Sequence, residues 1–338
     1  MTRYRSLLAL LVTLVLALSA CAGAQVPSRD DVSAQSGTPM PSEATQTDHV
    51  RVVVTIEFGA EQLVDQTLLL EPEMTALDAL RRVADVETAY GGAFVEAIEG
   101  VGADGEQGDA GRGDWFYFMN GFLAKESAGQ YVLRAGEVEH WDYRGWAFRS
   151  MVSATLQSFP TALAMGYNGT ISPTIVAYDE AFVREAEGTA TFLDTAGVLD
   201  VRVLPLRAVL DTDRENSNLV VLGSASASFV QELNLQWERV GLFAQFDGPT
   251  LRVFTSSGEN SAEYGDGVGL IEAMQNPWNP SGMGACENIV LLVTGTDDEG
   301  VSAAAEAVIS SRGEAANWPS AIVVDGVLMQ VPVRDSAD

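Results

Sequence analysis

An aromatic strand and a tight turn share one short segment, which reads Asp-Trp-Phe-Tyr-Phe-Met-Asn-Gly at residues 114–121. The apolar run from Trp115 to Met119 is typical of a β-strand, and Asn-Gly is the pair that two-residue type I′ hairpin turns favour. Because side chains alternate across a strand, Trp115 and Tyr117 are expected on one face of the sheet. The segment therefore predicts a strand with an aromatic face that ends in a hairpin.

The residues around this segment complete a small α+β unit. Runs of β-branched and apolar residues predict further strands over residues 50–58, 63–70 and 138–143. Apolar spacing predicts a helix over residues 76–84, with Thr75 as its N-cap and Asp78 in the reciprocal capping position. A hairpin, a helix and then more strands form the pattern of a sheet with one helix packed across it.

This order of elements resembles the transcobalamin-like C-terminal domain family. The motifs that carry the resemblance are Trp-x-Tyr-x-x-Asn-Gly at residues 115–121, Gly-Glu-Val at 136–138 and Trp-Asp-Tyr at 141–143. In the vertebrate cobalamin carriers this small β-grasp-like domain forms the second half of the protein, and bacterial members are commonly exported or lipid-anchored. The resemblance implies a β-grasp-like domain over residues 49–148 and cobalamin, or a related corrinoid, as a ligand captured for an uptake transporter.

Six residues of this domain are candidate ligand contacts. They are Trp115, Tyr117, Asn120, Trp141, Tyr143 and Trp146. Alternation also places Trp141 and Tyr143 on one face of their strand, and the four rings would form a flat apolar platform for a corrin, a nucleobase or a glycan. The alternative, favoured because a small sheet needs large side chains for its core, is that these rings pack internally. His140 points to the opposite face, where a structural role is favoured over cobalt ligation.

Residues 151–338 show a different pattern, in which apolar strands alternate with helices. Strands are expected over residues 174–178, 201–204, 218–222, 251–254, 288–293 and 321–324, and helices over 179–195, 227–235, 267–275 and 300–311. This alternation predicts an α/β domain with a mostly parallel sheet. Three segments, at residues 218–223, 267–280 and 290–297, loosely resemble α/β segments of surface-layer-type proteins, and that resemblance implies a cell-surface location.

No catalytic constellation is found in the sequence. The chain has two histidines and lacks a nucleophile elbow, a zinc-binding His-Glu-x-x-His and a P-loop, so we expect a protein that is not an enzyme and needs no cofactor or metal. Asp297 and Asp298 follow a strand, where a cation site is conceivable, but capping of the next helix is favoured. Cys286 is expected to be a buried apolar residue.

The N-terminal residues predict export. Arg3 and Arg5 precede an apolar run that ends in Leu-Ser-Ala-Cys at residues 18–21, which matches the bacterial lipobox. We therefore expect residues 1–20 to be a signal peptide and Cys21 to carry the lipid that anchors the chain to the cell membrane. Residues 21–48 are rich in Ser, Thr, Gln and Pro and predict a flexible tether on the extracytoplasmic side.

The net charge of the chain limits the classes of partner that it can bind. A formal net charge of −28 repels phosphate backbones, so nucleic-acid binding is excluded, and it also repels anionic headgroups, which leaves the lipid as the membrane contact. Two functions remain open. One is a ligand-capturing lipoprotein, with a corrinoid as the specific candidate. The other is a non-enzymatic cell-surface structural or adhesion protein that binds protein or polymer.

Overall fold

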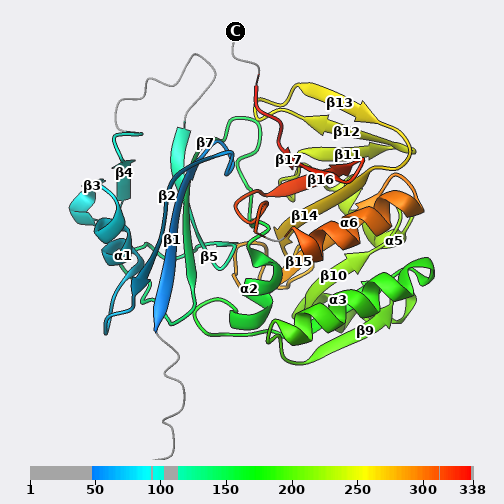
Figure 1. The fold of residues 1–338 in the computed structure, drawn as a ribbon, viewed down its shortest axis with the longest axis horizontal. Helices are drawn as coiled ribbons and strands as arrows, with labels where there is room; N and C mark the ends of the chain where they lie inside the picture. Colours follow the sequence, from blue (N-terminus) through cyan, green and yellow to red (C-terminus); the bar gives the residue numbers. More distant parts are fainter. Residues whose placement is uncertain (1–47, 93, 103–112, 312, 336–338) are drawn as a thin grey trace, which may run out of the picture. The chain divides into compact units, whose positions relative to one another are not determined.

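The first sheet of the protein contains five strands in the order β2-β1-β7-β5-β6 (Figure 1). These strands are β1 (His49–Ile56), β2 (Glu61–Leu69), β5 (Gly113–Met119), β6 (Phe122–Leu123) and β7 (Val138–Gly145). The central pair β1 and β7 is parallel, and the other neighbours are antiparallel. The computed structural model describes residues 48–92, 94–102, 113–311 and 313–335.

The turn and the helix of this half form as the sequence predicts. Asn120 and Gly121 have φ angles of 52° and 85°, the left-handed values that a type I′ turn requires, and they join β5 to β6. Helix α1 (Ala76–Val83) begins at a capping box in which Thr75 and Asp78 exchange hydrogen bonds. Strands β3 (Val86–Ala89) and β4 (Phe94–Ile98) form a separate ribbon around the short turn η1 (Tyr90–Gly92), which the sequence pattern did not indicate.

The second sheet is mixed, so the prediction of a mostly parallel sheet is wrong. Its seven strands have the order β17-β16-β14-β15-β10-β8-β9, in which β15, β10, β8 and β9 are parallel and β14, β16 and β17 pair in antiparallel fashion. The bounds are β8 (Thr174–Tyr178), β9 (Val201–Pro205), β10 (Asn218–Leu222), β14 (Gly269–Gln275), β15 (Ile289–Gly295), β16 (Ser320–Val324) and β17 (Val327–Val331).

The error arises at residues 267–275, which were predicted as a helix and form strand β14. Every residue from Gly269 to Gln275 is buried, because β14 lies between two strands and is covered on both faces. A segment buried on both faces has no polar side to reveal a period of two, so its apolar run fits a helix or a strand equally well. Because this segment crosses the sheet as a strand, it runs opposite to β15 and β16, and both of its pairings are antiparallel.

Helices cover both faces of the second sheet, as Figure 1 shows for α3 and α6 on one face. The helices of this half are α2 (Ser158–Met165), α3 (Val183–Thr195), α4 (Asp211–Asn216), α5 (Ser228–Leu235) and α6 (Asp298–Ser310), with the short turns η2 (Glu180–Phe182) and η3 (Leu206–Ala208). A three-stranded antiparallel sheet is made by β11 (Ala244–Asp247), β12 (Thr250–Phe254) and β13 (Asn260–Tyr264). Among the described residues, no helix is long and apolar enough to cross a membrane.

The two sheets share buried side chains. A single hydrophobic cluster contains the aromatic face of the first sheet together with residues of β14, β15 and α6. On the opposite face of the first sheet, the buried guanidinium of Arg144 lies over the rings of Phe58, Phe116 and Phe118, at 5.1, 4.5 and 5.1 Å from their centroids. Its Nη2 donates to the carbonyl of Val152 in the other half, at 3.3 Å. This cation is thus held between the two halves of the chain.

Candidate functional site

The structure brings four of the six candidate residues together and buries them. Trp115 pairs across β5 and β7 with Tyr143, and Tyr117 pairs with Trp141, with ring centroids 5.3 and 4.9 Å apart. All four side chains are between 4% and 8% exposed and belong to the core beneath α1. The rings share one face of the sheet, but they form packed cross-strand pairs and not an open flat platform.

The other two candidates and His140 have structural contacts. Asn120 holds the hairpin, because its Oδ1 accepts from Val138 N at 3.0 Å and its Nδ2 donates to a backbone carbonyl in the second half. Trp146 donates from Nε1 to Asp114 at 2.8 Å. His140 is buried on the opposite face, with Nε2 2.7 Å from the hydroxyl of Thr55, and burial lowers its pKa to about 3. The histidine is therefore neutral at physiological pH.

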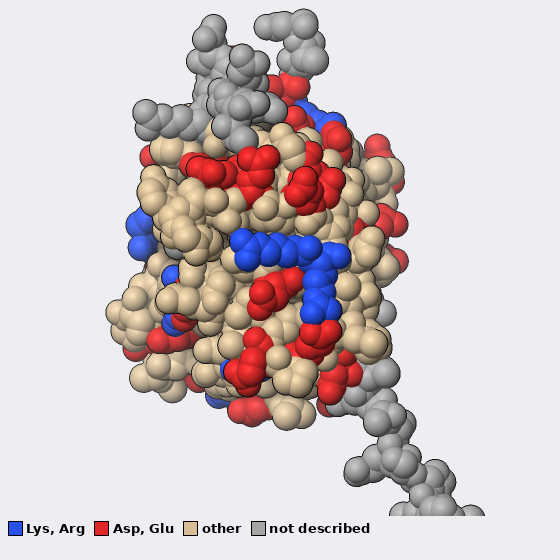
Figure 2. All heavy atoms as spheres, turned by 90° about the vertical axis from the view of Figure 1, so that its left-hand side faces the viewer, with Lys and Arg blue, Asp and Glu red and all other residues tan. Residues whose placement is uncertain are grey.

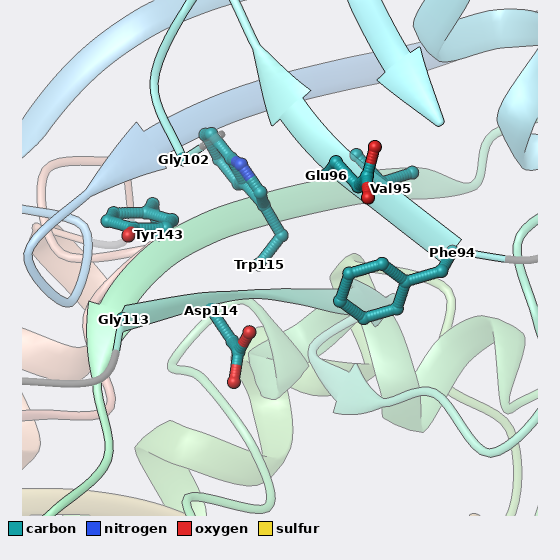
Figure 3. Close-up of a pocket in the computed structure, with 8 residues that line it drawn as sticks. All are labelled: Phe94, Val95, Glu96, Gly102, Gly113, Asp114, Trp115 and Tyr143. Carbon is teal, nitrogen blue, oxygen red and sulfur yellow. The ribbon is translucent and has the colours of Figure 1, made fainter. Parts of the chain in front are cut away.

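A cavity of about 240 Å³ lies at the edge of the first sheet, between β4 and the beginning of β5 (Figure 3). Strand β6 pairs only with Phe118 and Met119, so the outer edge of β5 is not hydrogen-bonded to β6 along its first half. Strand β4, which belongs to the separate ribbon, lies beside β5 there. The cavity is lined by Phe94, Val95, Glu96, Gly102, Gly113, Asp114, Trp115 and Tyr143. Trp115 and Tyr143 are thus the two members of the buried aromatic set that reach this site.

Two glycines allow the walls of the cavity to approach each other. At Gly102, where φ is +118°, a Cβ would lie 2.5 Å from the carbonyl oxygen of Glu96 and 2.8 Å from Nε1 of Trp115. At Gly113 a Cβ would lie 2.7 Å from the phenol of Tyr143. The indole of Trp115 is fixed by donation from Nε1 to the carbonyl of Val101 at 3.1 Å. Larger residues at either glycine would displace the aromatic rings from the cavity.

The cavity combines aromatic rings with carboxylates. In Figure 3, Asp114 and Trp115 leave β5 on opposite sides, Phe94 and Glu96 extend from β4, and Tyr143 closes the far end. Burial, and next the charge of Asp114, raise the pKa of the Tyr143 phenol, which therefore stays neutral. Among the described residues, none of those that line the cavity has a basic side chain.

Sequence reasoning missed the residues that β4 gives to this site. Phe94, Val95 and Glu96 lie in no recognisable motif, and β4 itself was not predicted. Asp114 begins the aromatic segment at residues 114–121 but was not among the candidate contacts. The one available signal was the run of glycines that starts at Gly100 and ends at Gly113, because glycine is required where chain segments approach closely.

The candidate positions in the second half have structural roles. Asp297 caps α6, with Oδ1 accepting from Gly300 N at 2.9 Å, and its Oδ2 accepts from Gly267 N at 2.8 Å. Cys286 is buried, and burial raises the pKa of its thiol to about 12, so the thiolate is scarce at neutral pH. Among the described residues, no three His, Cys, Asp or Glu side chains gather as a metal site. The predicted signal peptide, the predicted lipidation site Cys21 and the predicted tether up to residue 47 lie outside the described residues.

Comparison with known proteins places the cavity inside a family match. Residues 73–145 match the family described as Domain of unknown function (DUF4430), which is grouped with the transcobalamin-like families. The match includes all the residues that line the cavity and does not extend to residues 218–297, where the surface-layer resemblance was noted. The chain has no significant match among the curated proteins.

One solved structure similar to this chain is that of a proposed metal-binding protein from Ruminococcus gnavus. It is 17% identical, and the alignment covers 29% of this chain and 97% of that protein, with a TM-score of 0.22. We draw no functional conclusion from a likeness of this size.

Proposed function

We propose that this chain is a lipid-anchored, extracytoplasmic, non-enzymatic binding protein that captures a small ligand in the cavity between β4 and β5. The observation that carries the proposal is a preformed cavity with three aromatic rings and two carboxylates, whose walls depend on two glycines. Ligand sites are typically concave and contain a few placed polar groups. The lipobox at residues 18–21 supports the anchor and the location outside the cytoplasm.

A β-grasp-like fold of the first sheet belongs to this proposal. It is supported by the strand order β2-β1-β7-β5-β6, with a parallel central pair between the first and the last long strands of the unit. Helix α1 packs against β1 and β2, as a grasping helix would. The family match at residues 73–145 agrees with this assignment because it spans α1 and all of β7.

The size of the cavity bears on the corrinoid candidate. Pockets for drug-sized molecules have about 300–1,000 Å³, and this cavity has about 240 Å³. A corrin ring with its amide side chains is larger than a drug-sized molecule, so only a peripheral group of a corrinoid could enter. The buried aromatic pairs provide no second surface for the ring. A ligand smaller than a corrinoid is therefore favoured, and corrinoids are included among the compounds to be tested.

The test is titration of the full chain, purified in detergent, by calorimetry with cyanocobalamin and adenosylcobalamin, and by thermal shift with a library of small metabolites. The matched variants are Phe94→Ala, which removes a wall of the cavity, and Tyr90→Ala, which removes an aromatic ring outside it on the same ribbon. Phe94 is 44% exposed and Tyr90 is 88% exposed, so neither change should unfold the protein.

Binding near 1 μM, about −8 kcal/mol, that is lost in Phe94→Ala and kept in Tyr90→Ala would support capture in the cavity. Binding that is unaffected by Phe94→Ala would place the ligand elsewhere. If no compound of the library binds, the capture function is contradicted.

The second candidate function is a cell-surface structural or adhesion protein that binds protein or polymer. It is favoured by the burial of the four aromatic rings that would otherwise form a ligand platform. This function would be supported over ligand capture if the full chain pulls down cell-wall polymer and no compound of the metabolite library binds.

A further inference from the structure

We propose that the outer edge of strand β2 pairs with the same edge of a second copy of this chain and forms a symmetric dimer. This interface is independent of ligand capture, because β2 and the cavity lie at opposite edges of the first sheet. Three observations carry the proposal: the length of an unprotected edge strand, a row of backbone groups that face outward, and the local neutralisation of its acidic side chains.

Strand β2 forms a long and unprotected edge of the first sheet. It has nine residues, which makes it the longest strand among the described residues, and no described strand pairs with its outer side. Natural proteins keep edge strands short or protect them with Lys, Pro or a bulge, because an open edge can pair with another chain. From Glu61 to Leu69 there is no Lys, Arg or Pro. The one irregularity of the pairing, at Val54 and Thr55, leaves residues 65–69 regular.

The register with β1 decides which backbone groups of β2 face outward. The backbone N–H of Leu70 donates to the carbonyl of Asp48 at 2.7 Å, so these two residues form a hydrogen-bonded pair. In an antiparallel ladder such pairs alternate with pairs that are not hydrogen-bonded. The backbone groups of the even-numbered residues of regular β2 therefore face β1. Those of Asp65, Thr67 and Leu69 face outward, where a further strand would bind.

The positions of these three residues define the register of the dimer. Thr67 is the middle one, so an antiparallel pairing that uses all three places Thr67 opposite Thr67 of the second copy. Asp65 then lies opposite Leu69 of the second copy, and each pair can exchange two hydrogen bonds. A twofold axis at Asp65 would instead place two carboxylates opposite each other, which is destabilising. The same patch is used on both copies, as a twofold dimer requires.

The acidic side chains of β2 are neutralised, although the formal net charge of the chain is −28. Asp65 pairs with Arg51 at 2.7 Å, and Glu61 pairs with Arg334 at 3.6 Å. Figure 2 shows the side of the molecule that carries α1, where a band of basic side chains lies among acidic ones. A neutral edge reduces the repulsion between two copies and offers little charge for a basic peptide to recognise. A second copy is therefore favoured over a basic peptide as the occupant.

The first test is cross-linking of the full chain in membranes with a short bis-maleimide. Thr67→Cys places a thiol at the twofold axis. Gln62→Cys places one at another exposed position of the same strand, where the two copies of residue 62 would lie more than about 25 Å apart. We expect at least fivefold more cross-linked dimer in Thr67→Cys than in Gln62→Cys. Cys286 is buried and is present in both variants, so any reaction at its thiol cancels in the comparison.

The second test is sedimentation equilibrium of the full chain in density-matched detergent. Thr67→Lys places two lysines opposite each other at the twofold axis, and Thr191→Lys makes the same change at an exposed position of α3. We expect the association constant to fall at least tenfold in Thr67→Lys and to stay within twofold in Thr191→Lys. Raising the ionic strength should strengthen association of the wild type, because salt screens the repulsion between two acidic molecules. Thermal unfolding of both variants checks that the fold is kept.

The contrary outcomes are distinct from a failure of ligand capture. Equal cross-linking of the two cysteine variants, or equal association of the two lysine variants, would overturn the dimer. Cross-linking of Thr67→Cys to a different protein, in place of a second copy, would assign the edge to another occupant and would also overturn it. Association that weakens with salt would contradict a neutral interface. Titration of the cavity measures ligand capture separately, at the other edge of the sheet.

Discussion

The carboxyl of Glu272 is buried in the second half of the protein without a partner that would stabilise its charge. Glu272 lies in the middle of β14, opposite Leu292 on β15 and Ser320 on β16, and is 1% exposed. Its Oε1 has no hydrogen-bond partner among the described residues. Burial alone raises the pKa of this carboxyl from 4.5 to about 8. The proton that it keeps in the folded state links its ionisation to folding.

The direction and size of this linkage follow from the two pKa values. The folded protein holds the proton more tightly than the unfolded chain does, so the stability from this group is fully present below pH 4.5 and is lost as the pH rises to about 8. At about 1.4 kcal/mol per pH unit, the rise in pKa corresponds to a loss of about 5 kcal/mol between these limits. Glu272→Gln keeps the shape and removes the titration, so this variant should not show the loss.

Urea denaturation of the wild type and Glu272→Gln at pH 4.5, 6, 7 and 8 measures the effect. The free energy of unfolding of the variant, relative to the wild type, should increase steadily with pH over this range. Other buried acids, such as Glu139, titrate in both proteins and cancel in the difference. A difference that does not change with pH would refute the reasoning and show that water or a polar group reaches Glu272 in the folded protein.

Three further predictions concern the first half and the anchor. Thr75→Ala removes the N-cap of α1 and should lower the free energy of unfolding in urea by about 1 kcal/mol, whereas no change would mean that α1 is held by packing alone. Gly102→Ala should lower the free energy of unfolding by more than about 1 kcal/mol and abolish binding in the cavity. The loss of stability should exceed that of Gly100→Ala, because φ is positive at both glycines but a Cβ at Gly100 meets no other atom. Cys21→Ala should release the chain from the membrane fraction after cell breakage, and retention there would contradict the lipid anchor.

The elements that the sequence predicted well are those with a local physical cause. The hairpin at Asn120-Gly121 depends on two residues that tolerate positive φ, and the start of α1 depends on the Thr75 and Asp78 exchange. Both signals lie within a few residues of the element that they determine. The alternation of Trp115 and Tyr117 likewise fixed the face that they share, because it depends only on the pleat.

What the sequence could not supply depends on contacts between distant segments. Whether an aromatic face is open or covered is decided by what packs on it, and here α1 and the loops around it bury that face. The cavity arises because β4 lies beside the outer edge of β5, an arrangement that no spacing within either strand encodes. The prediction of a helix at residues 267–275 was wrong for the same reason, because the burial of β14 on both faces comes from its neighbours.

The parallel pairing of β1 with β7 has a mechanical consequence under the proposed N-terminal lipid anchor. The register runs from Arg51 beside Val138 to Ile56 beside Tyr143, so β1 starts at one end of the sheet and the cavity lies at the other. A pull between the tether and a captured ligand would therefore act along the strands. The hydrogen bonds between β1 and β7 would be loaded together in shear and not peeled apart one after another, which is the stronger arrangement under such a pull.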